Sequence, residues 1–155
     1  MDRKPHWREI IETMDKITSK DTVANRIETL RQAMYETAVD ACIVPTGDPH
    51  MSEYISDHYK VREFITGFTG SAGTAVITEE DAGLWTDSRY FLQAEEQLSG
   101  SGISLYKAGL PGTIKIQDFL KQKLGEGSTV CVDGRLVSSG WAKKMRQALT
   151  GSHID

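Results

Sequence analysis

The amino-acid sequence predicts an α/β fold in which a mixed β-sheet is covered by helices on both faces. Short apolar stretches rich in β-branched residues alternate with amphipathic stretches of about 10 to 15 residues, as in a sheet covered by helices. Residues 74–78 and 84–86 are joined by a short polar turn, which predicts an antiparallel hairpin and therefore a mixed sheet. With 155 residues, 39% of them hydrophobic, the chain is long enough to form one domain around a single core.

Two helices are expected at the start of the chain. Within residues 6–18, apolar side chains recur at helical spacing, which predicts a short amphipathic helix. A polar break follows, in which Asp21 or Thr22 is suited to cap the next helix. That helix is expected to end near Thr37, because the apolar residues from Val23 onwards fall four, three and four positions apart.

A short strand is expected at residues 41–44, where an apolar run stops at Pro45 and a Gly-Asp-Pro turn. The segment after this turn is ambiguous. Residues 51–58 are compatible with a helical turn, and residues 59–65 with either a short helix or a strand.

The centre of the chain carries the hairpin and a helix. Residues 74–78 are rich in β-branched side chains, which favours a strand. After a turn at 79–83, residues 84–86 return as the second strand. Residues 89–98 then predict a helix, which ends at a cluster of serine and glycine residues.

Two strands and two helices are expected in the last third of the chain. Residues 103–106 and 129–132 are short apolar stretches typical of strands. Residues 113–124 show helical spacing and stop at glycine. Ser138 or Ser139 is expected to cap the final helix.

These elements divide the chain into three regions. Residues 1–21 are expected to form a helical N-terminal extension, and residues 22–150 the folded domain. Residues 151–155 are expected to begin a linker to further domains, because the periodic pattern stops there.

Composition argues against several classes of function. The net charge of −4 and the sequence pI of about 5.6 lack the basic excess of a nucleic-acid-binding protein. No apolar run approaches the roughly 20 residues of a membrane span. The start of the chain has no apolar signal core. The chain is therefore expected to act in the cytoplasm, without nucleic-acid or membrane partners.

The two cysteines, Cys42 and Cys131, each lie within a short apolar run. This placement predicts buried, reduced thiols of a cytosolic protein. A disulfide between neighbouring strands is the alternative that the sequence leaves open.

Gly67, Gly70 and Gly73 form the motif that most invites a ligand. A phosphate-binding loop leads from a strand into a helix and carries a lysine, whereas here a strand follows and no lysine is nearby. We therefore interpret these glycines as a loop packed tightly against its own sheet. Ser71 lacks the first glycine of a nucleophile elbow, because Thr69 occupies that position.

The sequence contains no recognisable metal-binding motif. It has neither the helical two-histidine pair of a metallopeptidase nor a Cys-x-x-Cys pair. His50, Asp57 and His58 could meet in principle, but each also fits a solvated loop. Asp81 and Asp87 fall in separate predicted elements. We therefore expect this chain to bind no cofactor by itself.

Three charged residues stand out near the glycine motif and the hairpin. Asp87 and Arg89 are expected to form a buried or half-buried ion pair that fixes the turn from strand to helix. Residue chemistry leaves two readings for Arg62. Its guanidinium is either solvated or held in place toward a carboxylate or carbonyl outside the domain.

Several blocks of sequence occur together in a fixed order: Ile43–His50, Ser52–Ile55, Arg62–Thr78, Leu84–Leu98, Val130–Asp133 and Trp141–Met145. They resemble the N-terminal domain of the Xaa-Pro aminopeptidase (aminopeptidase P) family, in the creatinase and prolidase superfamily. The likeness spans about residues 22–150 and is strongest to the longer, cytosolic, three-domain form. Because several separate blocks match in the same order, the resemblance is more specific than a match to a single glycine motif would be.

The resemblance implies a parent enzyme that removes the N-terminal residue of peptides with proline in second position. In this family two divalent metal ions, commonly manganese, activate the attacking water, and a C-terminal domain supplies their ligands. No position here matches those ligand motifs. The resemblance therefore implies a non-catalytic domain that shapes the substrate entrance and supports subunit assembly. Its implied partners are the middle and C-terminal domains, a second subunit of a homodimer, and peptide substrates.

The resemblance also implies two residues near the substrate. In creatinase-like members an arginine and a phenylalanine of this domain reach toward a neighbouring active site, and Arg62 and Phe64 match these positions best. The sequence departs from the family pattern at Ser88, where glycine is expected. Serine is unfavourable there if the position needs a positive φ, and otherwise it is expected to cap the following helix.

The leading hypothesis is thus an isolated N-terminal domain of an Xaa-Pro aminopeptidase that is inactive alone. The alternative is a free-standing α/β binding or interaction module that reuses the fold without peptidase activity. A third hypothesis is a small enzyme or nucleotide-binding protein centred on the glycine motif.

Overall fold

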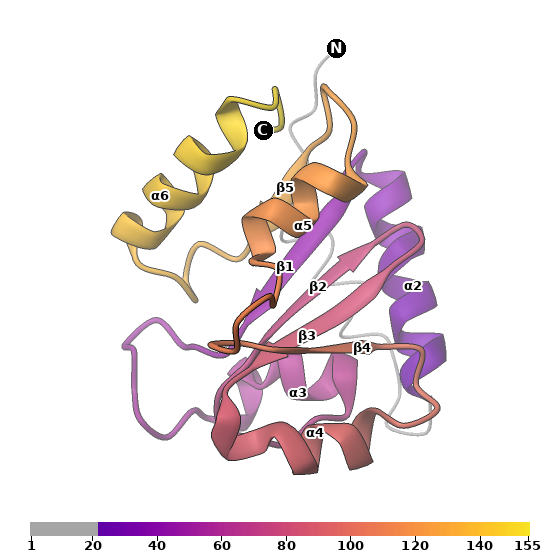
Figure 1. The fold of residues 1–155 in the computed structure, drawn as a ribbon, viewed down its shortest axis with the longest axis vertical. Coiled ribbons are helices and arrows are strands. Elements are labelled where there is room, and N and C mark those ends of the chain that lie inside the picture. The colour runs from indigo at the N-terminus through magenta and orange to yellow at the C-terminus, as the bar shows by residue number, and fades with distance from the viewer. Residues whose placement is uncertain (1–21) are drawn as a thin grey trace.

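A five-stranded sheet forms the centre of the domain, with the strand order β4-β3-β2-β1-β5 (Figure 1). The structure is a computed structural model that describes residues 22–155. The N-terminal extension and its expected helix therefore lie outside the described residues. The strands are β1 (Ala41–Pro45), β2 (Thr74–Thr78), β3 (Ala82–Thr86), β4 (Ser104–Lys107) and β5 (Val130–Val132).

The sheet contains both antiparallel and parallel pairs, which confirms the predicted mixed sheet. β2 runs antiparallel to β1 and to β3, so β2 and β3 form the expected hairpin. β4 joins β3 in parallel at one edge, and β5 joins β1 in parallel at the other.

Helices cover both faces of the sheet, as predicted. α2, α3 and α4 pack on one face, and α5 and α6 on the other (Figure 1). The helices are α2 (Val23–Glu36), α3 (Val61–Thr66), α4 (Phe91–Leu98), α5 (Ile116–Lys123) and α6 (Ser139–Thr150). Two 3-10 turns precede α3 and α4, namely η1 (Asp57–Tyr59) and η2 (Ser88–Tyr90).

Side chains cap two of these helices in the way that the sequence suggests. The Thr22 hydroxyl accepts a hydrogen bond of 3.3 Å from the backbone N–H of Asn25 at the start of α2. The Ser138 hydroxyl accepts one of 3.1 Å from Trp141 at the start of α6. Thr22 therefore caps α2, and Ser138 rather than Ser139 caps α6, while Asp21 lies outside the described residues.

The expectation for Ser88 is wrong. Ser88 is not among the described residues with a positive φ, so the position has no special need for glycine. Nor is Ser88 the cap: the carboxylate of Asp87 accepts the backbone N–H of Arg89 at 3.1 Å and opens η2. The carboxylate of Asp87, which offers two acceptor oxygens immediately before the turn, has taken the capping role.

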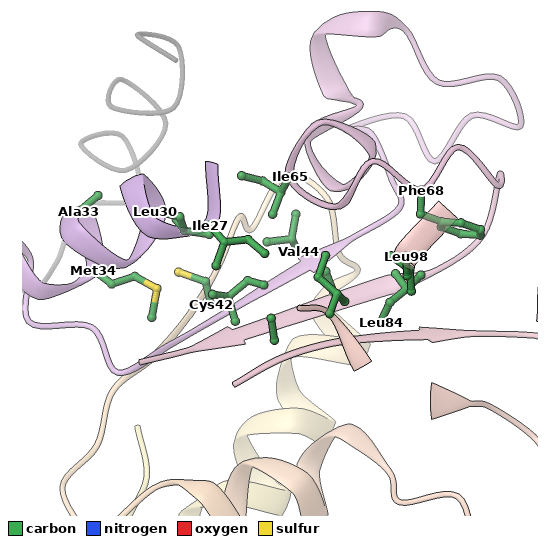
Figure 2. Packing of buried hydrophobic residues seen from close by; sticks show 14 of the residues in the cluster. Ile27, Leu30, Ala33, Met34, Cys42, Val44, Ile65, Phe68, Leu84 and Leu98 are labelled. Carbon is green, nitrogen blue, oxygen red and sulfur yellow. The ribbon is translucent and has the colours of Figure 1, made fainter. Parts of the chain in front are cut away.

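Two clusters of buried apolar side chains lie on opposite faces of the sheet, instead of the single core expected. Successive strand residues point to opposite faces, so Cys42 and Val44 belong to the first cluster, and Ala41 and Ile43 to the second. Figure 2 shows the first cluster, where one side of α2 packs onto the sheet. The labelled α2 residues are Ile27, Leu30, Ala33 and Met34, which are at most 4% exposed.

Aromatic rings organise the second cluster. The rings of Trp85 and Tyr106 stack with centroids 4.1 Å apart, and Phe119 of α5 meets Trp85 edge-on at 5.1 Å. Glycine is required beneath this stack, because a Cβ at Gly83 would lie 2.7 Å from the Tyr106 ring. The Trp85 indole N–H donates to the carbonyl of Ile114 at 2.8 Å, so its polar atom is satisfied.

The residues after α6 turn back onto the domain. Ile154 is 3% exposed and packs in the second cluster. The backbone of Asp155 accepts a hydrogen bond from Val130 at 2.6 Å and donates one to Ser128 at 3.0 Å. These contacts hold the segment beside β5. The domain boundary expected at residue 151 stays a prediction.

Candidate functional site

The glycine loop, residues 67–73, connects α3 to β2 and is packed around the ring of Phe68. Gly67 has a φ of 70° and ends α3 in the left-handed region that glycine tolerates best. A Cβ at Gly70 would lie 2.2 Å from the Phe68 ring, and one at Gly73 would lie 3.4 Å from it. Phe68 is fully buried, so the loop closes over its side chain only where glycines leave room.

Arg62 of α3 holds the glycine loop from inside. Its guanidinium donates to the carbonyls of Phe68 and Gly70, each at 2.5 Å, and to the hydroxyl of Thr46 at 3.1 Å. The guanidinium carbon also lies 4.9 Å from the centre of the Phe68 ring. The fork geometry of arginine allows one side chain to hold two carbonyls and a hydroxyl at once.

Among residues 22–155, the charge of Arg62 is buried without a carboxylate partner. The residue is 4% exposed, and none of the ion pairs among residues 22–155 includes it. Burial lowers the pKa of Arg62 to about 10, although the negative charge of Glu63 acts in the opposite direction. The side chain stays protonated at neutral pH. The reading of a solvated guanidinium is therefore wrong, and the guanidinium binds carbonyls of its own domain in place of a group outside it.

Thr46 connects β1 to the same loop. Its hydroxyl donates to the Gly73 carbonyl at 2.8 Å and accepts from the Gly73 N–H at 3.1 Å. Its backbone N–H donates to that carbonyl as well, at 2.9 Å. Together with Arg62, Thr46 fixes both ends of the glycine loop to the sheet, so the loop is a preformed surface.

The outer side of the glycine loop is joined to α4 and η2. The Thr69 N–H donates to the side-chain carbonyl of Gln97 at 2.9 Å, and the Thr69 hydroxyl accepts from both Gln93 and Gln97. Ser71 forms a hydrogen bond with the hydroxyl of Tyr90. Ser71 therefore lies at the exposed tip of a loop and is bonded to a phenol, in place of the histidine of a serine-hydrolase triad.

A pocket of about 250 Å³ lies between the glycine loop and the loop of residues 46–60. Its wall includes Thr46, Tyr54, Tyr59, Arg62 and Ser71. Glu53, Lys60 and Glu63 add charges of both signs. The pocket thus combines a fixed guanidinium with aromatic surface and hydroxyl groups, a composition suited to a polar group attached to an apolar body.

The 46–60 loop presents apolar side chains to solvent. Tyr54 is 87% exposed and Met51 is 72% exposed. Asp48 folds the base of this loop: its carboxylate accepts the backbone N–H groups of His50 and Ser52, both at 2.9 Å. These hydrogen bonds lower the pKa of Asp48 below its usual value, and the bond from the Ser52 N–H has the largest effect. Sequence reasoning did not single out Tyr54 or Asp48, although the Asp-x-x-x-Ser spacing is compatible with a side-chain-capped turn.

Phe64 lies on a different side of α3 from Arg62. The guanidinium carbon of Arg26, in α2, is 4.4 Å from the centre of the Phe64 ring. Arg26 also donates to the Phe64 carbonyl at 2.7 Å. Phe64 packs against the first core cluster and is not part of the pocket wall. The structure therefore does not bring the side chains of Arg62 and Phe64 together.

Asp87 and Arg89 form the expected ion pair, but at the surface. Nε and one terminal nitrogen of Arg89 donate to the two carboxylate oxygens at 2.9 and 2.8 Å. Asp87 is half-buried, whereas the side chain of Arg89 is 66% exposed, so the pair is more open to water than a buried pair. The two-point contact lowers the pKa of Asp87 below its usual value. The pair borders the turn into η2, where water weakens its effect on stability.

Metal ligands are not gathered anywhere in the part of the chain that the structure describes. Within residues 22–155, no three or more His, Cys, Asp or Glu side chains lie close enough together to hold an ion. In the same range, no helix is both long and apolar enough to cross a membrane. The described site is thus a preformed loop and pocket.

The chain is similar to known proteins along most of its length. The Creatinase/Prolidase N-terminal domain family matches residues 26–155. The chain is 42% identical over 136 residues to aminopeptidase P2 of Arabidopsis thaliana, which covers 86% of this chain and 19% of the plant protein. It is 41% identical over 150 residues to Xaa-Pro aminopeptidase 1 of Dictyostelium discoideum, covering 92% of this chain and 24% of that protein.

Solved structures show the same fold. One is X-prolyl aminopeptidase from Caenorhabditis elegans, which is described as a cytosolic enzyme with a di-nuclear active site. It superimposes with a TM-score of 0.73 at 30% sequence identity, and the match covers 94% of this chain and 23% of the worm chain. The N-terminal domain of a metallopeptidase from Corynebacterium diphtheriae matches with a TM-score of 0.63 at 21% identity, covering 86% of this chain and 92% of that one. The chain spans about a fifth to a quarter of the curated relatives that it matches.

Proposed function

The chain belongs to the family of Creatinase/Prolidase N-terminal domains, and from this membership we propose that it serves as the non-catalytic first domain of a metal-dependent Xaa-Pro aminopeptidase. Such an enzyme releases the N-terminal residue from peptides with proline in second position. The proposal rests on the Xaa-Pro aminopeptidases among its relatives. In it, a middle and a C-terminal domain complete the enzyme, and the C-terminal domain holds two divalent ions of the manganese type.

Within this enzyme, the domain shapes the substrate entrance and supports assembly of a homodimer in the cytoplasm. The structural observation that carries the proposed role at the entrance is the set of hydrogen bonds made by Arg62. Its guanidinium is bonded to Thr46 and to two carbonyls of the glycine loop, so it fixes a surface. That surface is one wall of the 250 Å³ pocket.

The same pocket gives the site residues their proposed roles. Arg62 is close to the substrate as part of the pocket wall, while Tyr54 and Tyr59 offer apolar contact to a peptide. Gly67, Gly70 and Gly73 keep the loop in shape, and the pair Asp87–Arg89 closes the adjacent turn. Phe64 remains a proposed substrate-proximal residue of the complete enzyme, although its ring packs near Arg26 in this domain.

A chimera tests the proposal. Residues 22–150 would replace the matching segment of the Dictyostelium Xaa-Pro aminopeptidase 1, and release of the first residue from an Xaa-Pro-Xaa peptide would be measured with manganese present. We expect the chimera to retain activity within about tenfold, because the catalytic groups lie elsewhere. The chain alone should release no amino acid. A Tyr54→Ala chimera should show a raised KM with an unchanged kcat.

Two outcomes would contradict the proposal. Turnover by the chain alone, abolished by Arg62→Met, would mean that the domain carries its own catalytic centre. A folded chimera without activity, whose parent enzyme is active in the same assay, would favour the alternative of a free-standing binding or interaction module.

A further inference from the structure

Cys42 and Cys131 lie directly opposite each other on neighbouring strands. Cys42 is in β1 and Cys131 in β5, and the parallel register pairs their Cα atoms. Cys42 belongs to the first core cluster, and Cys131 packs against the same cluster. Both side chains therefore point to one face of the sheet. Both thiols are free.

The backbone separation suits a disulfide. Strands paired in a sheet lie about 4.8 Å apart, so residues in register have Cα atoms near that distance. Disulfides usually join Cα atoms that are roughly 4.4 to 6.8 Å apart. A bond between these cysteines thus needs only side-chain rotation and a small adjustment of the short edge strand β5.

The two thiols differ in their access to solvent. Cys42 is 0% exposed in the central strand β1, whereas Cys131 is half-buried in β5 at the edge of the sheet. This corrects the expectation that both are buried. Burial, and then the nearby sulfur of Cys131, raise the pKa of the Cys42 thiol well above its usual value. A small oxidant in solution reaches Cys131 first.

We infer that Cys42 and Cys131 form a redox-sensitive site, in which hydrogen peroxide oxidises Cys131 and Cys42 then closes a disulfide between β1 and β5. This inference is independent of the proposed peptidase function. In the first step, the Cys131 sulfur attacks one peroxide oxygen, the O–O bond breaks, and a sulfenic acid and water are formed. In the second step, the Cys42 sulfur attacks the Cys131 sulfur, the S–O bond breaks, and the departing hydroxide takes the Cys42 proton as water. Two thiols and one hydrogen peroxide thus give one disulfide and two waters.

The bond would fasten the edge strand to the sheet. β5 has three residues, each paired with β1, and it precedes α6 in the chain. The covalent ring would enclose about 90 residues, a length at which a cross-link restricts the unfolded chain strongly. Oxidation should therefore raise the thermal midpoint of the domain, and reduction should return it to its starting value.

Mass spectrometry of the full chain tests the inference directly. The protein would be treated with an equimolar amount of hydrogen peroxide, quenched by alkylation, and digested without reductant. We expect a loss of two mass units, no free thiol, and a single cross-linked peptide that contains Cys42 and Cys131. Dithiothreitol should restore two alkylatable thiols.

Single-cysteine variants separate the two roles. With Cys42→Ala, oxidation should stop at Cys131 with one or more added oxygens, because no resolving thiol is present. With Cys131→Ala, Cys42 should remain alkylatable after unfolding. The inference fails if wild-type protein accumulates oxygen on Cys131 while Cys42 stays free, or if it forms only intermolecular disulfides. The wild-type result decides the matter even if a variant does not fold.

Discussion

Arg62 shows how one buried charge can organise a surface loop without a carboxylate partner. Its three hydrogen bonds end on neutral oxygens, two of which are backbone carbonyls that would otherwise be buried and unpaired. Hydrogen bonds from charged donors are the stronger kind, and they offset part of the cost of burying the guanidinium. The residue is therefore a fixed part of the loop.

The substitution Arg62→Met should destabilise the domain by about 2 to 4 kcal/mol, because it leaves the Phe68 and Gly70 carbonyls without donors. Urea denaturation followed by circular dichroism gives the free energy of unfolding. Arg62→Lys should recover only part of the loss, since an ammonium group cannot bridge three acceptors. The matched control is Arg89→Met, which removes an exposed pair and should cost less than about 1 kcal/mol. Equal losses at the two positions would contradict the role given to Arg62.

For single residues, the sequence predicted which side chains pair more reliably than it predicted how buried they are. The spacing of Asp87 and Arg89 indicated their ion pair, because two residues on one turn must be neighbours. Their exposure could not be inferred, since it depends on what covers the end of the hairpin. The acceptors of Arg62 were also hidden, because backbone carbonyls leave no trace in the pattern of side chains. Cys131 is half-buried because β5 is an edge strand, and strand order is not visible in the sequence.

At the scale of elements, the glycine loop depends on one aromatic ring. Phe68 is fully buried between the loop and the sheet, and Gly70 lies against its face. Arg62, Thr46 and Thr86 hold the loop carbonyls, the last by donating to Ala72 at 2.6 Å. The loop therefore cannot move outward without breaking several hydrogen bonds.

Gly70→Ala should destabilise the domain by about 1 to 3 kcal/mol, because the new methyl group would overlap the Phe68 ring. The change in the urea midpoint would report it. The control is Gly125→Ala, where the added Cβ meets no atom within 4 Å and φ is not positive. That control should be neutral or slightly stabilising. A neutral result at Gly70 would mean that the loop adapts easily and does not present a fixed wall.

The sequence anticipated most elements for a physical reason. The helical spacing of apolar residues marked the side of α2 that faces a core, and the β-branched residues of β2 marked it as a strand. The segment of residues 59–65 was ambiguous because seven residues are too few to distinguish a helical from a strand-like pattern. It proved to be α3, where Arg62, Ile65 and Thr66 are buried. The pocket was not predictable, since most of its lining comes from loops that have no periodic pattern.

At the scale of the whole molecule, the end of the described chain contributes to the second cluster. Ile154 packs there, and Asp155 is hydrogen-bonded beside β5. If residues 151–155 were only a linker, removing the Ile154 side chain would change nothing. Ile154→Ala is instead expected to cost about 2 to 4 kcal/mol of unfolding free energy. Leu92→Ala, at a position that is 82% exposed, is the control and should change stability by less than about 0.5 kcal/mol.

The sheet has a further consequence because it separates the two clusters of buried side chains. Neighbours along β1 contribute alternately to opposite clusters, so a change in one cluster has no direct contact with the other. Free-energy changes from substitutions on opposite faces should then be nearly additive. Each face could accept new packing arrangements in evolution without compensating changes across the strands.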